Sequence, residues 1–368
     1  MDFSIENAST LRVINICKLL KKQYETTIVG TGKSDMKTIS EIYYRFVSRD
    51  GINSKFNKFI RRITYPFLLI RLLNKIPSIN AFVFYGLYGY CLFILQAYAK
   101  YRHIKTIYDA VEWYEYSHYR FGVLNPSVWQ IHWTMVRLIK RCQGIICISS
   151  YLLNYYQKCN PNVIFIPPLM EIIESRVEEH ELEEDYLNLI YAGKAEKKDL
   201  IWCAIEGVMK LKEEGVKIKL YIIGPTEIYS EKHGLLIDDK VIICKGRMSR
   251  SDVLKFLHAA DFSIIIRDDT KRYAKAGFST KFVESFSMSL PVIANLTGDM
   301  GTYLKNGING FVIEKPTVED FCNTIRYVYN RQMGKNKEMK RNAYNTFLDY
   351  FELTNYQKPI LSYFNSII

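Results

Sequence analysis

The fold is decided by two similar segments, LNLIYAG at residues 187–193 and IKLYIIG at residues 218–224. Each is a short, mostly apolar run that ends at a glycine. Runs of this kind, bounded by turn residues, are typical of strands buried on both faces of a parallel sheet. Four more follow, with helical sequence between them: VIIC (241–244), FSIIIR (262–267), PVIAN (291–295) and GFVI (310–313). This alternation predicts a doubly wound α/β domain.

The first half of the chain has the same pattern. Its apolar runs are TTIVGTG (26–32), AFVFYG (81–86), TIYDA (106–110), GIICIS (144–149) and VIFIPP (163–168), and an acidic stretch, EIIESRVEEHELEED (171–185), follows them. We therefore predict two doubly wound, Rossmann-like domains that face each other across a cleft. The predicted parts are an N-terminal domain (1–168), an acidic linker (169–186), a C-terminal domain (187–344) and a last helix (345–368) that packs back on the N-terminal domain.

The predicted N-terminal domain lacks the apolar strand with which such domains usually begin. A polar segment, DFSIENAST (2–10), and then a helical segment stand where such a domain normally begins with an apolar strand. Either the natural start lies upstream of Met1, which we prefer, or the domain lacks a central strand. Mass spectrometry of the native N-terminus would separate the two.

Composition and charge limit the class of protein. The chain has 368 residues, 48% hydrophobic and 24% charged, as in a globular protein. Its eight cysteines form no C-x-x-C pair, which favours reduced thiols in the cytoplasm over a disulfide framework or a zinc site. The formal charge is +12, and no acidic residue occurs between Asp50 and Asp109. A basic surface of this kind suits anionic lipid, nucleic acid or a diphosphate-bearing substrate.

Two segments raise the question of a membrane. Residues 81–99 carry no charge and approach the length of a bilayer span, but Gly86 and Gly89 divide them, which favours a buried strand, turn and helix. In the region Lys55–Lys75, apolar residues recur at helical spacing among basic ones. This helix lies either in a membrane interface or against the core with a solvated basic face.

Three loops at predicted strand ends carry candidate binding residues. YAGKAEKKD (191–199) places lysines after a glycine turn, which suits a diphosphate, although a lysine-rich surface loop is the alternative. In AGFSTKFVE (276–284), a helix begins after small residues, which suits an anion, and a carboxylate stands two turns later, where it could hold a ribose diol. CKGRMSRSDV (244–253) offers a turn whose backbone could grip a base. The candidates are Lys194, Lys197, Lys198, Gly246, Arg247, Met248, Gly277, Phe278, Ser279, Thr280, Lys281 and Glu284.

These loops together resemble the second half of retaining glycosyltransferases of family 4, which have the GT-B fold. The resemblance covers residues 187–315 well and is weaker in the first half. It implies that Glu284 binds the ribose of a sugar nucleotide, that the lysine loop (194–198) holds the diphosphate, and that residues 277–280 contact the phosphates and the sugar. The turn at residues 246–248 would lie beside the base. In the first domain, Asp109 and Glu112 are candidates for the acceptor side, with a structural acid at a turn as the alternative.

The sequence departs from the family pattern at two places. The family has paired glutamates, and Ala276 stands at the first position, which leaves the donor sugar open. The lysine loop is shorter than usual, and Lys194 replaces an arginine.

The resemblance implies metal-independent transfer with retention and no cofactor, and it favours a UDP-linked donor, with guanosine as the open alternative for the base. It favours surface-polysaccharide synthesis of the capsule, O-antigen or exopolysaccharide type on a lipid-linked or saccharide acceptor. We expect a peripheral protein at the inner membrane face, held to anionic lipid through Lys55–Lys75 and binding no nucleic acid. A same-fold sugar-nucleotide epimerase, an inactive scaffold relative and, less favoured, a nucleic-acid-binding protein are the alternatives.

Overall fold

The computed structural model describes residues 8–32, 38–39, 42–48, 55–173, 182–193, 198–224, 240–332 and 336–368, and side chains are described for these residues except 31–32, 38–39, 46–48 and 55–62. The chain divides into two compact units. Unit 1 comprises residues 1–167 and 356–368, and unit 2 comprises residues 168–355.

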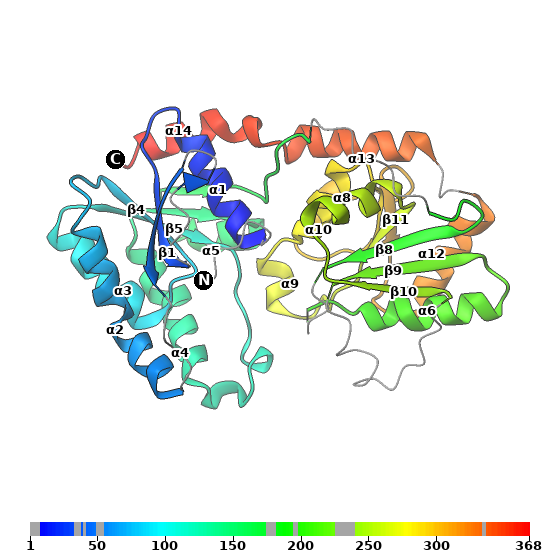
Figure 1. The fold of residues 1–368 in the computed structure, drawn as a ribbon, viewed down its shortest axis with the longest axis horizontal. Coiled ribbons are helices and arrows are strands. Elements are labelled where there is room, and N and C mark those ends of the chain that lie inside the picture. The colour runs from blue at the N-terminus through cyan, green and yellow to red at the C-terminus, as the bar shows by residue number, and fades with distance from the viewer. Residues whose placement is uncertain are drawn as a thin grey trace. The chain divides into compact units, whose positions relative to one another are not determined.

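Unit 2 is built on a six-stranded parallel sheet with the order β10-β9-β8-β11-β12-β13 (Figure 1). The strands are β8 (Leu187–Ala192), β9 (Ile218–Ile223), β10 (Ile242–Gly246), β11 (Phe262–Ile265), β12 (Val292–Asn295) and β13 (Gly310–Ile313). Numbered within the unit, this is the order 3-2-1-4-5-6, which defines a doubly wound sheet whose strand order reverses between β8 and β11.

Both faces of this sheet are covered. Alternate strand residues enter two separate apolar cores: Leu189 lies with Leu220 in one, and Ile190 lies with Tyr221 in the other. The first core includes α6 (Ile201–Glu213) and α12 (Val318–Asn330), and the second includes α8 (Arg250–Ala259). The near-continuous apolar runs of the sequence are thus explained by burial on two sides.

The remaining helices of unit 2 follow β11 and the strands beyond it. They are α9 (Arg272–Ala276), α10 (Thr280–Ser287), α11 (Met300–Tyr303) and α13 (Lys337–Tyr350). Helix α10 contacts β11, β12 and α13. An aromatic cluster that includes Phe278, Phe282 and Phe351 packs where α10 meets the end of α13.

Unit 1 contains two sheets. A parallel sheet has the order β4-β5-β6-β7, formed by β4 (Ala81–Tyr85), β5 (Lys105–Ala110), β6 (Gly144–Cys147) and β7 (Val163–Phe165). A smaller sheet has the order β1-β3-β2, formed by β1 (Thr27–Gly32), β2 (Thr38–Ile39) and β3 (Ile42–Ser48). Among the strands that the structure describes, no pairing joins the two sheets, and the first described element is helix α1 (Ala8–Leu20).

The other helices of unit 1 are α2 (Lys55–Leu73), α3 (Gly89–Tyr101), α4 (Pro126–Trp133), α5 (Ser150–Tyr156) and α14 (Gln357–Asn365). Short helical turns include η2 (Gly122–Leu124) and a π-helical segment, η3 (Thr134–Leu138), that continues α4.

Three features of the fold bear on the sequence predictions. The uncharged segment 81–99 is confirmed as strand, turn and helix, because β4 ends at a turn where Gly86 and Gly89 both have positive φ (64° and 59°) before α3 continues. No helix in the described part of the chain is long and apolar enough to cross a membrane. In α2, Leu69 and Leu73 are buried whereas Ile63 and Phe67 are exposed, so one side of this helix packs inward and another meets water.

The C-terminal boundary differs from the predicted one. Helix α13 belongs to unit 2, and only the residues from Tyr356 onward belong to unit 1. There α14 contacts α1, and the Tyr363 hydroxyl donates to the Asn162 carbonyl (3.1 Å). Much of the acidic linker, residues 174–181, lies outside the described residues.

Candidate functional site

The topology of unit 2 makes the carboxyl ends of β8 and β11 the candidate position for a site. In an open parallel sheet, ligands bind beyond the strand ends at the point where strand order reverses. The loop after β8 begins with Gly193, and the loop after β11 contains Arg267. Both loops therefore meet at this point, and the isolated bridge between Asp199 and Arg267 joins them.

Glycines allow the strand ends to approach one another closely. The Gly193 N–H donates to the Ile223 carbonyl (2.8 Å), and the Gly224 N–H donates to the Gly246 carbonyl (2.8 Å). A Cβ on Gly224 would lie 2.1 Å from the Gly193 carbonyl oxygen, so a side chain there would force the two loops apart.

Asp199 organises a buried charge cluster beneath these loops. Its Oδ2 accepts from the Lys281 Nζ (2.6 Å) and the Tyr191 hydroxyl (2.7 Å), and its Oδ1 accepts from the Arg267 Nε (3.1 Å). Burial raises the pKa of Asp199, but Lys281, Arg267 and the hydrogen bonds lower it further, so the net pKa lies well below its usual value. One carboxylate thus holds two cations at the strand ends, and the cluster carries a net positive charge.

The position of Lys281 depends on the glycine that follows β8. The Lys281 ammonium lies 5.2 Å from the centroid of the Tyr191 ring. A Cβ on Gly193 would lie 2.1 Å from the Lys281 Cε, and Gly193 has a φ of +155°, which favours glycine. The absence of a side chain at Gly193 therefore leaves room for the lysine beside the loop.

The segment Gly277–Thr280 lies at the N-terminus of α10, as the sequence predicted, but its side chains differ in kind. Phe278 is buried in the aromatic cluster, where it packs rather than faces a ligand. Ser279 is the N-cap of α10, and its buried Oγ has no hydrogen-bond partner among the described atoms. An unsatisfied buried hydroxyl at a helix N-terminus could form a hydrogen bond with an anion or a sugar hydroxyl.

Glu284 stands on the same helix and pairs with a residue that sequence reasoning missed. The Arg250 Nη1 donates to the Glu284 Oε1 (2.8 Å), and both side chains are partly exposed. Arg250 opens α8, directly after the N-cap Ser249. The only sequence signal was the position of Arg250 two residues after the turn 246–248, which was predicted to lie beside a base.

That turn, Gly246–Met248, follows β10. Gly246 has a φ of +67°, which explains the glycine. Arg247 is exposed, and Met248 packs against the apolar core between the sheet and α8. Because Glu284 and Arg250 are bonded, the structure brings this turn and α10 to the same region of unit 2.

The lysine loop is described in part. Lys194 and Lys197 lie outside the described residues. Lys198 is partly exposed, and its carbonyl accepts from the Tyr273 hydroxyl (3.2 Å), which ties the loop to α9. Ala276, at the position of the missing acid, is buried.

The two candidates in unit 1 have different surroundings. Asp109 is buried, and both of its oxygens accept from Arg12 (2.8 Å each), which also donates to the carbonyls of Ile166 and Pro167. This geometry favours the structural alternative for Asp109. Glu112 is partly exposed and accepts from the Tyr114 hydroxyl.

Within the described ranges, no group of three or more His, Cys, Asp or Glu side chains could hold a metal ion. The described groups of the candidate site are two cations, the first backbone amides of α10, a hydroxyl and a partly exposed carboxylate. Groups of these kinds suit an anionic ligand that carries hydroxyl groups.

Residues 173–346, nearly the whole of unit 2, match the family model for glycosyl transferases group 1. The matched segment is just under half of the 368-residue chain. An uncharacterized glycosyltransferase of Methanocaldococcus jannaschii is 23% identical over 193 residues, which are 51% of this chain and 50% of the relative. The match thus spans about half the length of that protein.

Solved structures establish the fold. HepE of Anabaena, solved in complex with UDP and glucose, matches with a TM-score of 0.73 and 12% identity over 99% of this chain and 98% of its own. WaaG, a glycosyltransferase involved in lipopolysaccharide biosynthesis, matches with a TM-score of 0.69 and 14% identity over 98% of this chain and 97% of its own. The protein has the GT-B fold, as the sequence predicted.

Proposed function

We propose that this protein is a retaining, metal-independent glycosyltransferase that moves a sugar from a nucleoside-diphosphate sugar to a saccharide acceptor. The observation that carries the proposal is the convergence, at the switch point of a GT-B sheet, of a two-cation cluster with a helix bearing a free N-cap hydroxyl and a partly exposed glutamate. The family match of residues 173–346 supports the same reaction class.

The roles follow from the chemistry of each group. Lys281 and Arg267 outnumber the Asp199 carboxylate, so the strand ends favour the diphosphate and the charge that develops as it leaves. The Ser279 hydroxyl and the first amides of α10 would add hydrogen bonds to phosphate or sugar. Only the Oε1 of Glu284 accepts from Arg250, and its Oε2 is the oxygen we assign to the ribose diol.

The finer features of the proposal rest on other observations. A UDP-linked donor is favoured because HepE binds UDP and glucose. A lipid-linked acceptor and a role in surface polysaccharide are favoured by the basic character of unit 1, and WaaG acts in lipopolysaccharide biosynthesis. We place the protein at the inner face of the membrane, with the region Lys55–Lys75 toward anionic lipid. The side chains of residues 55–62 lie outside the described residues.

Nucleotide binding without acceptor tests the site directly. We expect UDP, among UDP, GDP, ADP and CMP, to raise the melting temperature of the protein, and we expect magnesium to leave this shift unchanged. Calorimetric titration should then show that UDP binds more tightly than 2′-deoxy-UDP, because Glu284 holds the diol. Glu284→Gln should remove most of this preference, about tenfold or more in affinity for a hydrogen bond to a charged group.

The matched control is Glu314→Gln, which neutralises an exposed acid of the same unit. It should keep the preference for the ribose form. If Glu284→Gln binds both nucleotides as the parent protein does, Glu284 does not hold the ribose and the site assignment fails. Interconversion of a sugar nucleotide without acceptor would instead support the same-fold epimerase.

A further inference from the structure

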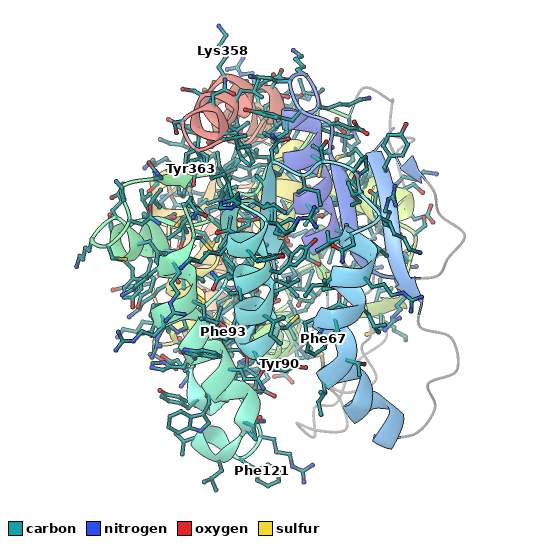
Figure 2. All side chains as sticks on the ribbon, turned by 90° about the vertical axis from the view of Figure 1, so that its left-hand side faces the viewer. Phe67, Tyr90, Phe93, Phe121, Lys358 and Tyr363 are labelled. Atoms are coloured by element: carbon teal, nitrogen blue, oxygen red, sulfur yellow. The ribbon has the colours of Figure 1, made fainter. Side chains whose placement is uncertain are left out.

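Unit 1 presents large apolar side chains to water on three adjoining helices and a loop. Helix α3 contacts both α2 and α4, and α4 contacts η2. Figure 2 looks toward this side of unit 1 and labels Phe67, Phe93 and Phe121. A contiguous exposed apolar patch marks an interaction site, whereas single exposed apolar residues are ordinary. The exposed residues are Ile63, Phe67, Phe93, Phe121, Val123, Leu124, Trp129 and Trp133.

Helix α3 contacts α4, and α4 begins within the segment 120–129, which we call the α4 loop. The Phe93 ring of α3 lies 5.7 Å from the Trp133 ring of α4, centroid to centroid. One helical turn earlier, the Trp129 Nε1 donates to the Val123 carbonyl (2.7 Å) and holds the indole against η2. The apolar surface therefore continues from α3 along α4 to the loop tip.

The polar groups of the α4 loop are largely satisfied within the loop. The N–H groups of Gly122, Leu124 and Asn125 donate to carbonyls of Tyr119, Phe121 and Gly122. The Asn125 side chain donates to the Arg120 carbonyl and accepts from the Ser127 N–H. A loop with satisfied donors can enter an apolar phase without the cost of unpaired polar groups. The bonded Trp129 indole has the same advantage.

The conformation of Phe121 also points to a function. This residue has a φ of +68°, in the left-handed region that bulky side chains rarely occupy. Its side chain is 70% exposed, so burial of the ring does not compensate for the strain. Backbone strain of this kind is typical of residues held in place for binding.

The charges around the loop identify the kind of partner. Residues 116–141 contain Arg120, Arg137, Lys140 and Arg141 and no acidic residue, and Glu112 and Glu115 precede this segment. The Arg120 guanidinium lies 5.0 Å from the Phe121 ring, so a cation stands beside the exposed aromatic side chain. Aromatic and aliphatic tips flanked by basic residues match the acyl boundary and the anionic headgroups of a lipid bilayer.

We propose that the α4 loop inserts into the interfacial layer of an anionic lipid bilayer. Phe121, Leu124 and Trp129 enter the acyl boundary, and Arg120 meets the headgroup phosphates. This contact lies outside the region Lys55–Lys75 and adds apolar insertion to its electrostatic attraction. It is independent of the donor site in unit 2, so it can hold even where the proposed transferase reaction fails.

Co-sedimentation of the intact protein with phosphatidylcholine vesicles, with and without phosphatidylglycerol, tests the proposal. We expect binding to the anionic vesicles and a loss of roughly tenfold or more in affinity for Leu124→Gln, whose side chain is 81% exposed in the parent. Ile308→Gln, which removes an exposed aliphatic side chain from unit 2, is the matched control and should bind as the parent does. Phe121→Asn should also bind weakly while keeping its melting temperature, because asparagine tolerates the left-handed conformation.

Insertion depth is read from quenching of tryptophan fluorescence by brominated phosphatidylcholine. We expect quenching in the parent protein and a large decrease in Trp129→Phe. Equal vesicle binding by Leu124→Gln and the parent would overturn the proposal, as would binding that high salt abolishes and that produces no quenching. Failure to bind vesicles, together with self-association that Leu124→Gln removes, would assign the surface to a second copy of this chain instead.

Discussion

Neutralising Asp199 is the most direct test of the charge cluster at the carboxyl ends of β8 and β11. Asp199→Asn leaves Lys281 and Arg267, whose side chains are only 18% and 11% exposed, without their common counter-charge. Removing one partner of a buried ion pair typically costs about 3–5 kcal/mol. Because both cations keep some access to water, we expect the lower end, about 3 kcal/mol. For a unit of this size that lowers the melting temperature by about 6–12 °C.

The assay can report on unit 2 alone. Of the four tryptophans, only Trp202 belongs to unit 2, where it packs against the core between the sheet and α6. In a background with the other three replaced by phenylalanine, Trp202 fluorescence follows the unfolding of this unit in urea.

The control for this experiment removes a hydrogen bond but no charge. Tyr191→Phe deletes one donor to Asp199 and should cost about 1 kcal/mol. Because the folded pKa of Asp199 is depressed, its contribution to stability is present above its unfolded pKa and is lost only as the pH falls through the folded value. The difference between Asp199→Asn and the parent should therefore stay constant between about pH 5 and about pH 8. An Asp199→Asn cost no larger than that of Tyr191→Phe would refute the reasoning.

Two further outcomes are expected. Gly193→Ala should lower the free energy of unfolding of unit 2 by about 1–3 kcal/mol, because the added Cβ would lie 2.1 Å from the Lys281 Cε in a backbone conformation that favours glycine. Urea denaturation should show a smaller cost of Gly193→Ala when Lys281 is also replaced by alanine. An equal cost in the two backgrounds would contradict the contact. At pH 8, an aromatic disulfide reagent should titrate two of the eight thiols rapidly, those of Cys159 and Cys244, which are exposed. Burial raises the pKa of four slow thiols, to about 12 for Cys17, Cys91 and Cys203 and to about 11 for Cys142. Rapid reaction of any of these four would contradict their burial.

The strands of unit 2 could be predicted because their signal is local. Each apolar run is short and ends at a turn residue, so type and position are both visible in the sequence. In unit 1, β3 was missed, although it pairs in parallel with β1, because its segment IYYRFVS mixes polar and apolar residues and lacks a continuous apolar run. The extent of the last domain was also misjudged, since α13 and α14 are both helical and only their packing assigns them to different units.

The candidate site was predicted in its residue types but not in its pairings. Glu284 and Lys281 were recognised from the family pattern and the start of a helix. Arg250 was not, because it lies thirty-four positions from Glu284 in sequence and nothing local marks the contact. The same holds for Asp199, which looked like the end of a lysine loop and instead anchors two cations from other segments.

The sequence by itself determined the doubly wound class, the glycine turns at the strand ends and the basic character of the first half, because these depend on periodicity, backbone freedom and composition. Only the tertiary structure decided which acid binds which cation. It paired Asp109 with Arg12 in a buried site, placed Asp199 between Lys281 and Arg267, and left the α4 loop exposed. The physical reason is that ion pairing and burial depend on distances between segments far apart in the chain, and those distances are set when the sheet and its helices pack.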